Sequence, residues 1–376
     1  MRIFMFVSNF LPHLGGLEFY VHDISSALAK NWGDETHVFC FDDFEKSYEI
    51  NHNYIVHRIK RLTTVGGVFS IPDPFSLLRT LNLVLKKSGR PNQVWTHTRF
   101  FISSLVGVVF AKLLGIRTLH IEHGSTHVVH ASQAISNIAK LWDHTLGRVV
   151  LSCANVVVVV SPLAKQFVEK LGAKRVFFVP AGATEQFLNP EKAIFKLPKS
   201  PKLLFVGRLL PGKGVENLIR SLQDQRLVHV SLDIIGDGPQ KNFLENLSAQ
   251  LGLEGRVRFR GSISREELPG WYENASIFVN PSFSEGGPLT VLEALGMGVP
   301  VVSTPVGCVE YYFSAPERHG VLTRGFSVED LANALDRAIK DFSFQERKSC
   351  SISIRDAFSW VEVAGTIRSL GEGGVK

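Results

Sequence analysis

Two glutamates flank a glycine-rich turn in residues 281–300. Glu285 lies in the turn, and Glu293 lies eight residues later, inside a predicted helix that follows a strand ending near Asn280. Pro288 suits the first turn of this helix, because an N–H at that position has no intrahelical partner. Free amides at a helix N-terminus bind anions through their geometry and the helix dipole. The amides that we expect to do so belong to Gly287, Leu289 and Thr290, and Gly286 is a further candidate binding residue beside them.

The two carboxylates therefore lie on either side of a predicted anion site. Glu293 is about 7–8 Å along the helix axis, at ~1.5 Å per residue. Carboxylates accept hydrogen bonds from sugar and ribose hydroxyls, and a diphosphate between them would lie on the amides. A nucleotide sugar has this layout of sugar, diphosphate and ribose. The structural alternative is that Glu285 caps the helix and Glu293 lies on the protein surface.

A second turn, residues 207–214, carries two cations. It follows the predicted strand 202–206 and contains Arg208 and Lys213 among three glycines. Both side chains can lie over the end of the same sheet as Glu285 and neutralise a diphosphate with charge-assisted hydrogen bonds. Without the glutamates, an ordinary solvated turn would be the better interpretation.

The elements that position these residues follow a βαβ pattern. Short β-branched and aromatic runs alternate with helix-period segments, as in doubly wound parallel sheets. The stretch 180–201 contains four prolines and indicates a linker. We therefore expect an α/β protein with a Rossmann-like domain in residues 1–180, a second one in 181–355, and a C-terminal helix in 356–376 that returns to the first domain. Ligands of such sheets bind at the carboxyl ends of strands, which predicts a cleft between two facing domains.

Composition narrows the class of protein. The chain has 376 residues, 45% of them hydrophobic, and four cysteines far apart in the sequence. These values favour a cytoplasmic globular protein with reduced thiols, and no apolar run is long enough to span a bilayer. Residues 1–180 contain 19 Lys and Arg against 12 Asp and Glu, so the net charge of +6 arises in this half. No motif or long basic run indicates nucleic acid, and no Cys/His cluster has metal-ligand spacing.

Together these motifs resemble glycosyltransferase family 4. The resemblance rests on Gly207-Arg208, Lys213-Gly214, the two glutamates, and the segments 235–239 and 296–300. It covers nearly all of the second half and is thinner in the first. It implies the GT-B architecture of two facing Rossmann-like domains. It also implies a retaining, metal-independent enzyme that uses a nucleotide sugar and needs no cofactor.

The resemblance also assigns roles to residues. Glu285 would hold the transferred sugar, Glu293 the ribose, and Arg208 and Lys213 the departing diphosphate. Donor contacts are further implied for Gly16, Gly236 and Ile263, an acceptor-side glycine loop for Gly15, Gly16 and Glu18, and a place near the reaction centre for His123. The family often has an aromatic residue and then glycine after the first Glu-Gly. Here Gly287-Pro288 stands instead, which leaves the donor sugar open.

The acceptor is less well defined by the sequence. We expect a glycan or lipid-linked hydroxyl, used in the synthesis of cell-surface polysaccharide or glycolipid. The basic first half and the apolar residues at helical spacing in 135–146 indicate peripheral contact with an anionic membrane, although this face can equally belong to the core. Two other functions remain open, a nucleotide-sugar epimerase or phosphorylase on the same scaffold and a non-catalytic nucleotide-sugar sensor. The lone Gly236-Asp-Gly238 lacks the third glycine of the dinucleotide fingerprint, so an oxidoreductase is rejected.

Overall fold

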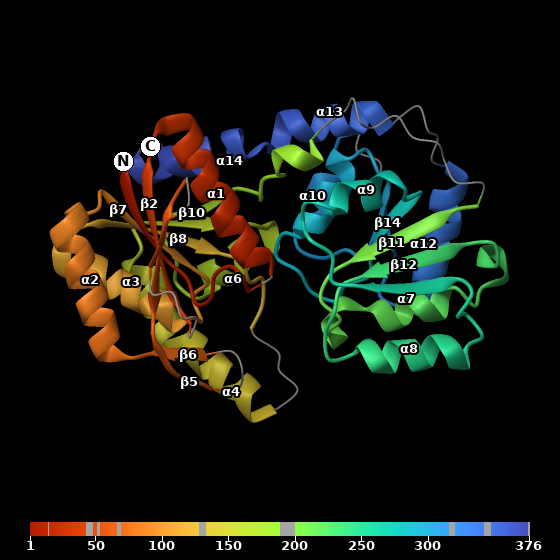
Figure 1. Ribbon diagram of the computed structural model, residues 1–376, viewed down its shortest axis with the longest axis horizontal. Coiled ribbons are helices and arrows are strands. Elements are labelled where there is room, and N and C mark those ends of the chain that lie inside the picture. The colour runs from red at the N-terminus through yellow and green to blue at the C-terminus, as the bar shows by residue number, and fades with distance from the viewer. Residues whose placement is uncertain are drawn as a thin grey trace. The chain divides into compact units, whose positions relative to one another are not determined.

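A computed structural model describes residues 1–13, 15–42, 48–50, 53–65, 69–127, 133–188, 200–315, 320–341 and 347–374. The chain divides into two compact units (Figure 1). Unit 1 comprises Met1–Ala181 and Trp360–Lys376, and unit 2 comprises Gly182–Ser359. The predicted boundaries were 180/181 and 355/356, and most of the second half of the predicted linker lies outside the described residues.

Unit 1 is built on a mostly parallel sheet in the order β10-β9-β8-β7-β1-β2-β4-β3, in which the edge strand β3 is antiparallel to β4. The described strands of this sheet are β1 (Arg2–Phe6), β2 (Glu35–Phe41), β3 (Tyr48–Ile50), β4 (Ile55–Ile59), β7 (Gln93–His97), β8 (Arg117–Glu122), β9 (Val156–Val159) and β10 (Val176–Phe178). A separate hairpin pairs β5 (Arg61–Val65) with β6 (Phe69–Pro72). Strands β1 and β9 are buried on both faces, which explains their nearly continuous apolar sequences, whereas the central strands β7 and β8 also bury polar side chains.

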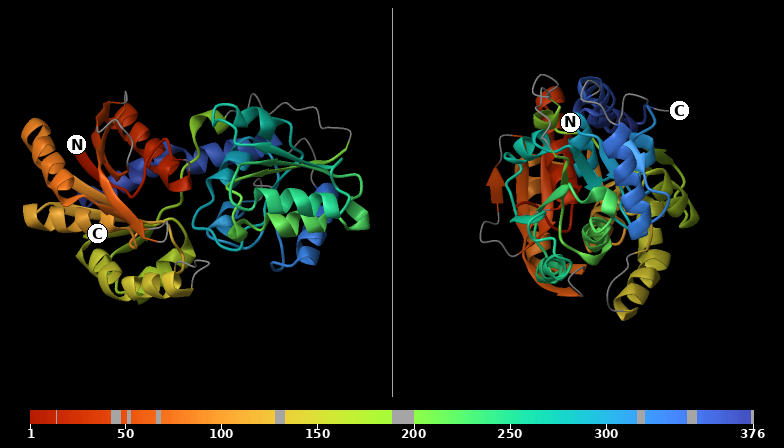
Figure 2. Two further views of the ribbon diagram at one scale, coloured as in Figure 1. Left: turned by 60° about the horizontal axis from the view of Figure 1, so that its bottom comes forward. Right: turned by 90° about the vertical axis from the view of Figure 1, so that its right-hand side faces the viewer.

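Helices cover both faces of this sheet. Side chains alternate along β1, so Phe4 and Phe6 pack under α2 and α3, while Met5 contacts Ser25 of α1 on the other face. The left view of Figure 2 shows the orange helices α2 and α3 next to one another. The described helices of unit 1 are α1 (Gly16–Trp32), α2 (Pro74–Ser88), α3 (Ile102–Leu114), α4 (Gln133–Trp142), the π-helix η1 (Asp143–Gly147), α5 (Arg148–Cys153), α6 (Pro162–Lys170) and α14 (Trp360–Glu372).

The C-terminal helix α14 packs on α1 of the same unit. Trp360 is buried at its start, and its ring meets the ring of Tyr20 edge to face at 4.9 Å. Trp360 therefore anchors the start of α14 on α1 by packing.

Unit 2 has a fully parallel sheet in the order β13-β12-β11-β14-β15-β16. Its described strands are β11 (Lys202–Val206), β12 (Ser231–Ile235), β13 (Val257–Gly261), β14 (Ile277–Asn280), β15 (Val301–Ser303) and β16 (Gly320–Leu322). Its described helices are η2 (Glu185–Phe187), η3 (Pro211–Lys213), α7 (Val215–Ser221), η4 (Gln225–Leu227), α8 (Lys241–Gln250), α9 (Leu268–Glu273), α10 (Leu289–Gly296), α11 (Val309–Tyr312), α12 (Val328–Asp341) and α13 (Arg347–Phe358). The strand order reverses between β11 and β14, which is where ligands of open α/β sheets bind.

No helix in the described part of the chain combines the length and the apolar composition needed to cross a bilayer.

Candidate active site

The two loops at the reversal point of unit 2 hold the most informative residues of the sequence. Residues 207–214 follow β11, and residues 281–288 follow its neighbour β14. Because parallel strands end at the same edge of a sheet, Arg208, Lys213 and Glu285 come together there. The tertiary structure thus unites two motifs more than 70 residues apart.

Lys213 and Glu285 form an ion pair. Nζ of Lys213 lies 2.6 Å from Oε1 of Glu285, and their side chains are 30% and 15% exposed. Arg208 is exposed at the end of β11, and its guanidinium makes no hydrogen bond or ion pair to another residue that the structure describes. One cation is therefore fixed against a carboxylate, and a second is available to an anion.

The helix α10 starts next to this pair. Its N-cap is Pro288, with φ −68° and ψ 107°, and no side chain caps it. Pro288 thus lies one position before the predicted first turn, and Glu285 does not cap the helix. The first amides, from Leu289 and Thr290, have no intrahelical acceptor and offer the positive end of the helix dipole to an anion.

Glu293 is on the fifth residue of α10 and is only 5% exposed, so the surface alternative is wrong. Its carboxylate accepts a hydrogen bond from the hydroxyl of Tyr272 at 3.0 Å and lies 3.5 Å from the guanidinium of Arg265. Burial raises the pKa of Tyr272 well above its usual value, and the neighbouring Glu293 raises it further. Tyr272 therefore stays protonated and orients the carboxylate.

Sequence reasoning missed Arg265 and Tyr272. Arg265 follows β13 and also donates to the hydroxyl of Thr184 at 2.7 Å, while Tyr272 is a fully buried residue of α9. No spacing rule links either residue to Glu293. The one available signal was that a glutamate on an apolar helix must find polar partners if it is buried.

A buried polar network holds the loop after β14. Nδ2 of Asn280 donates to the hydroxyl of Ser303 at 2.9 Å, and the hydroxyl of Ser282 donates to Oδ1 of Asn280 at 3.0 Å. The hydroxyl of Thr304 donates to the carbonyl of Ser282 at 2.5 Å. The network fixes the backbone that leads to Glu285.

Two glycines allow the loops of unit 2 to approach one another. A Cβ on Gly214 would lie 2.0 Å from the carbonyl oxygen of Pro281, and Gly214 has φ +66°. A Cβ on Gly236, with φ +134°, would lie 1.9 Å from the carbonyl oxygen of Gly207. Gly236 thus has a packing reason to be glycine besides the donor contact that the resemblance implies. Ile263 is half-buried just beyond the end of β13, at the same edge of the sheet.

The remaining predicted site residues lie in unit 1. Gly15 is the N-cap of α1 in an extended conformation, Gly16 is the first helical residue, and Glu18 lies in the first turn. A Cβ on Gly16 would meet nothing within 4 Å, so packing within the described residues does not require glycine there. The space beside Gly16 is open to another group.

His123 follows β8 directly. Its Nε2 lies 3.3 Å from Nδ1 of the buried His97, and the ring of Tyr20 meets it edge to face at 4.7 Å. Burial lowers the pKa of His123 to about 4, partly opposed by the Glu122 carboxylate. His123 is therefore a neutral imidazole near pH 7. His120 is an ordinary core histidine, bonded to Thr96 and Glu122.

A fully buried ion network lies behind His123. Nη1 of Arg99 lies 3.0 Å from Oε1 of Glu122, and its Nε lies 3.0 Å from Oδ1 of Asp143. Asp143 begins the π-helix and also accepts from Nδ1 of His127 at 2.6 Å. Although burial alone raises the pKa of Glu122, the guanidinium brings it well below its usual range. The ion pairs of Arg99 thus link the segment after β7 and the end of β8 to the π-helix η1.

Comparison with family models agrees with this fold. Residues 14–186 match the model described as Glycosyltransferase Family 4, and residues 189–355 match the model described as Glycosyl transferases group 1. The chain belongs to glycosyltransferase family 4. Its two Rossmann-like sheets are those of the GT-B fold, as the sequence predicts.

Individual proteins show the same resemblance over nearly the whole chain. An uncharacterized glycosyltransferase of Methanocaldococcus jannaschii is 25% identical over 377 residues, which cover 96% of this chain and 95% of the relative. The sucrose-phosphate synthase of Thermosynechococcus elongatus superposes with a TM-score of 0.80 at 22% identity, over 99% of this chain and 98% of that one. The Anabaena protein HepE, in complex with UDP-glucose, gives a TM-score of 0.74 at 18% identity, over 99% of this chain and all of that one.

Proposed function

We propose that this glycosyltransferase moves a hexose from a nucleoside diphosphate sugar to a hydroxyl of a glycan or lipid-linked acceptor. The observation that carries the proposal is the Lys213–Glu285 pair beside the uncapped N-terminus of α10, with the buried Glu293 on the same helix. This edge of unit 2 offers cations and amides to a diphosphate and a carboxylate to the hydroxyls on either side of it. HepE, with UDP-glucose bound, has the same fold.

In this proposal, the site residues of unit 2 have three different roles. Glu285 accepts hydrogen bonds from the sugar hydroxyls, and Glu293 accepts them from the ribose. Arg208, Lys213 and the amides of Leu289 and Thr290 stabilise the negative charge that develops on the departing diphosphate. Lys213 also holds Glu285 in place through the 2.6 Å ion pair.

The reaction proposed is a front-side displacement that retains the anomeric configuration. The acceptor oxygen forms a bond to the anomeric carbon as its bond to the diphosphate oxygen breaks, and the acceptor proton passes to the leaving diphosphate. The charge on the leaving group is met by Arg208 and Lys213, so no metal ion is required. From unit 1 we assign His123, a neutral imidazole, to the reaction centre, and Gly15, Gly16 and Glu18 to the acceptor side.

The physiological setting follows from the acceptor class. We infer that the enzyme acts in the cytoplasm, in the synthesis of cell-surface polysaccharide or glycolipid, and that it meets an anionic membrane peripherally. Nucleic acid is not a proposed partner.

A thermal-shift panel of UDP, GDP and ADP, followed by their hexose conjugates, tests donor binding. A nucleotide that binds this site should raise the melting temperature of the protein, and one base should do so more than the others. The preferred donor is then incubated alone, and release of nucleoside diphosphate and free sugar is followed by chromatography. Absence of stabilisation by every nucleotide would refute the site. Conversion of the donor to an epimeric nucleotide sugar would identify an epimerase. Donor binding without turnover, whichever acceptor is then added, would identify a sensor.

A further inference from the structure

One long segment of unit 1 has no acidic side chain on its surface. Between Asp73 and Glu169 the sequence contains ten Lys and Arg but only two carboxylates, Glu122 and Asp143. Both carboxylates are fully buried and paired with Arg99. The surface that residues 74–168 form is therefore purely cationic in its formal charges.

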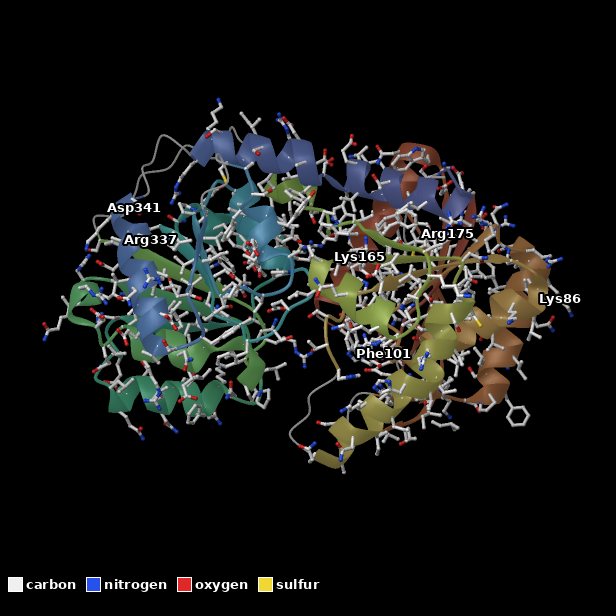
Figure 3. The ribbon with its side chains drawn as sticks, turned by 180° about the vertical axis from the view of Figure 1, so that it is seen from behind. Lys86, Phe101, Lys165, Arg175, Arg337 and Asp341 are labelled. Carbon is white, nitrogen blue, oxygen red and sulfur yellow. The ribbon has the colours of Figure 1, made fainter. Side chains whose placement is uncertain are left out.

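The helix α2 presents this charge together with apolar side chains. It begins at Pro74, where Asp73 caps it by accepting from the Ser76 amide at 2.9 Å. Its outer side carries Phe75, which is 84% exposed, and Leu78, which is 67% exposed. Three cations share that side, and among the described residues they form no hydrogen bond or ion pair. These are Arg79, Lys86 and Lys87. Lys86 projects outward from the helix in Figure 3.

The neighbouring helix α3 continues the same surface. The inner sides of α2 and α3 share one apolar core under the sheet, so their outer sides face solvent together. Leu113 of α3 is 81% exposed and lies next to the exposed Lys112. We call the outer side of these two helices the α2–α3 face. Phe75 and Leu78 lie three residues apart on one helix and form an exposed apolar pair. Large apolar side chains that are exposed together, rather than singly, mark an interaction surface.

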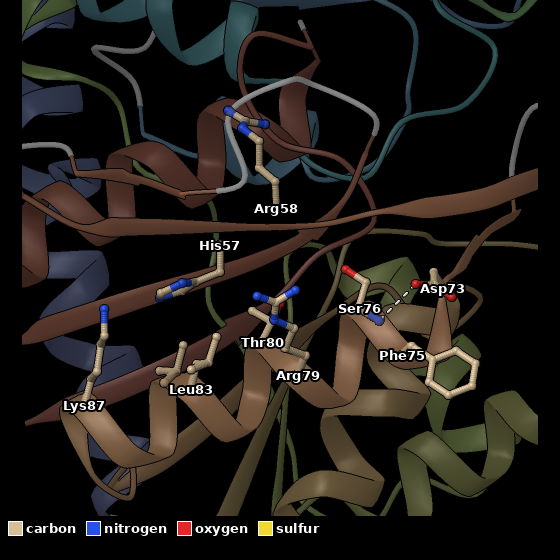
Figure 4. A pocket seen from close by; sticks show the side chains of 10 residues that line it. His57, Arg58, Asp73, Phe75, Ser76, Arg79, Thr80, Leu83 and Lys87 are labelled. Atoms are coloured by element: carbon tan, nitrogen blue, oxygen red, sulfur yellow. Dashed lines mark hydrogen bonds between the residues drawn. The ribbon is translucent and has the colours of Figure 1, made fainter.

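A pocket opens beside α2. Its volume is about 620 Å³, and it lies between α2 and β4. Figure 4 shows Arg79, Thr80, Leu83 and Lys87 along the helix opposite His57 of β4. The acid that lines it is Asp73, which is engaged as the helix cap. Three cations line the pocket, and one of them, Arg58, is paired with Asp42. The other two, Arg79 and Lys87, together with the apolar wall, suit the phosphate and the adjoining chain of a phospholipid.

We propose that the α2–α3 face docks on an anionic lipid bilayer, with Phe75, Leu78 and Leu113 in the interface and the cations on lipid phosphates. Interfacial helices bind in this way through apolar burial and attraction to anionic lipid. The inference deepens the proposed function, on which it rests, because it selects the lipid-linked acceptor over a soluble glycan.

The face differs from the one that the sequence favoured. The helix α4 overlaps the predicted segment 135–146 and does expose Ile138 and Leu141, so its apolar face is not all core. However, α4 carries a single cation, Lys140, and α2 carries three over its 15 residues. Charge complementarity to anionic lipid therefore places the contact on α2.

Co-sedimentation of the full chain with vesicles tests the proposal. Vesicles of phosphatidylcholine with 30% phosphatidylglycerol are compared with pure phosphatidylcholine, at low and high salt. Each cation near an anionic surface changes binding by about fivefold, so R79Q/K86Q/K87Q should lower the partition coefficient by about a hundredfold. F75S/L78S should lower it through lost apolar burial. R258Q/R324Q/R337Q is the matched control, because it removes the same charge from exposed positions in unit 2 and should bind as the wild type does.

Three results would overturn the proposal. They are equal binding to the two kinds of vesicle, wild-type binding by the α2 triple variant, and an equal loss in the control variant. A dimer that F75S/L78S dissociates, without vesicle binding, would assign the face to a second copy instead. Melting curves verify that each variant folds. Nucleotide stabilisation is measured on the same variants, so that failure of membrane docking is distinguished from failure of the donor site.

Discussion

Replacing Lys213 by alanine tests whether this lysine only forms a structural ion pair or also stabilises the departing diphosphate. The Lys213–Glu285 pair is partly solvated, with side chains 30% and 15% exposed. Pairs of this kind stabilise a fold by about 1 kcal/mol or less. For a unit of this size that corresponds to a melting-temperature decrease of about 2–4 °C. If the ion pair were only structural, the variant would therefore retain nearly all of its activity.

The catalytic role predicts a much larger effect on rate. Removing one preorganised donor from a developing anion costs on the order of 3–4 kcal/mol in the barrier. This corresponds to a decrease in turnover of about a hundredfold to several hundredfold. The assay is release of nucleoside diphosphate from the donor at saturating concentration, with melting curves recorded on the same samples.

Lys202→Ala provides the matched control. Nζ of Lys202 lies 2.8 Å from Oδ2 of Asp233, with a similar lysine exposure of 25%. Lys202 begins β11, at the opposite edge of the sheet from the candidate site, and Asp233 keeps Arg260 as a partner at 2.7 Å. This variant should lose stability to a similar extent and keep its turnover.

Two results would refute the reasoning. The first is a turnover decrease of less than tenfold in Lys213→Ala. The second is recovery of turnover in a Lys213→Ala/Glu285→Gln double variant, because the loss would then come from the unpaired charge of Glu285 and not from the missing cation.

Three further changes probe the remaining parts of the chain. Glu293→Gln should weaken nucleotide binding by about tenfold to a hundredfold, because hydrogen bonds to a charged group contribute about 1.5–3 kcal/mol. Calorimetric titration measures the affinity, and Tyr272→Phe should show a smaller loss. Unchanged affinity in both variants would remove Glu293 from the ribose site. Gly214→Ala places a Cβ 2.0 Å from the Pro281 carbonyl at φ +66°, so it should destabilise unit 2 by about 2 kcal/mol or more, and an unchanged melting curve would contradict the close approach. Because burial lowers the pKa of His123 to about 4, the unfolded chain binds a proton at a higher pH than the folded protein does. The free energy of unfolding should therefore fall as the pH drops from about 6.5 toward 4. In melting curves His123→Gln should show a shallower decline, and an identical slope would contradict this role of His123.

Much of the fold follows from local patterns. The apolar strands, the glycine turns and the break near residue 180 are short-range features, and they predict two doubly wound sheets. The antiparallel hairpin β5–β6 interrupts the alternation of strands and helices and does not follow from it. The apolar side chains of α2 occur on both its inner and its outer side, which blurs the periodicity that sequence reasoning depends on.

The candidate site shows the same division. The sequence identified Arg208, Lys213, Glu285 and Glu293 because their residue types and their positions after strands are local features. It did not identify Arg265, which comes from the loop after another strand and meets Glu293 only in the folded sheet.

By itself the amino-acid sequence determined the family and the alternation of strands and helices, and it indicated the residues that we propose for a diphosphate and its hydroxyl-bearing neighbours. Only the tertiary structure decided that Lys213 pairs with Glu285, that Glu293 is buried against Tyr272, and which helices leave their cations and apolar side chains exposed. The physical reason is that strand order and helix packing join residues far apart in the chain. Burial and pairing depend on those contacts, and no local pattern contains them.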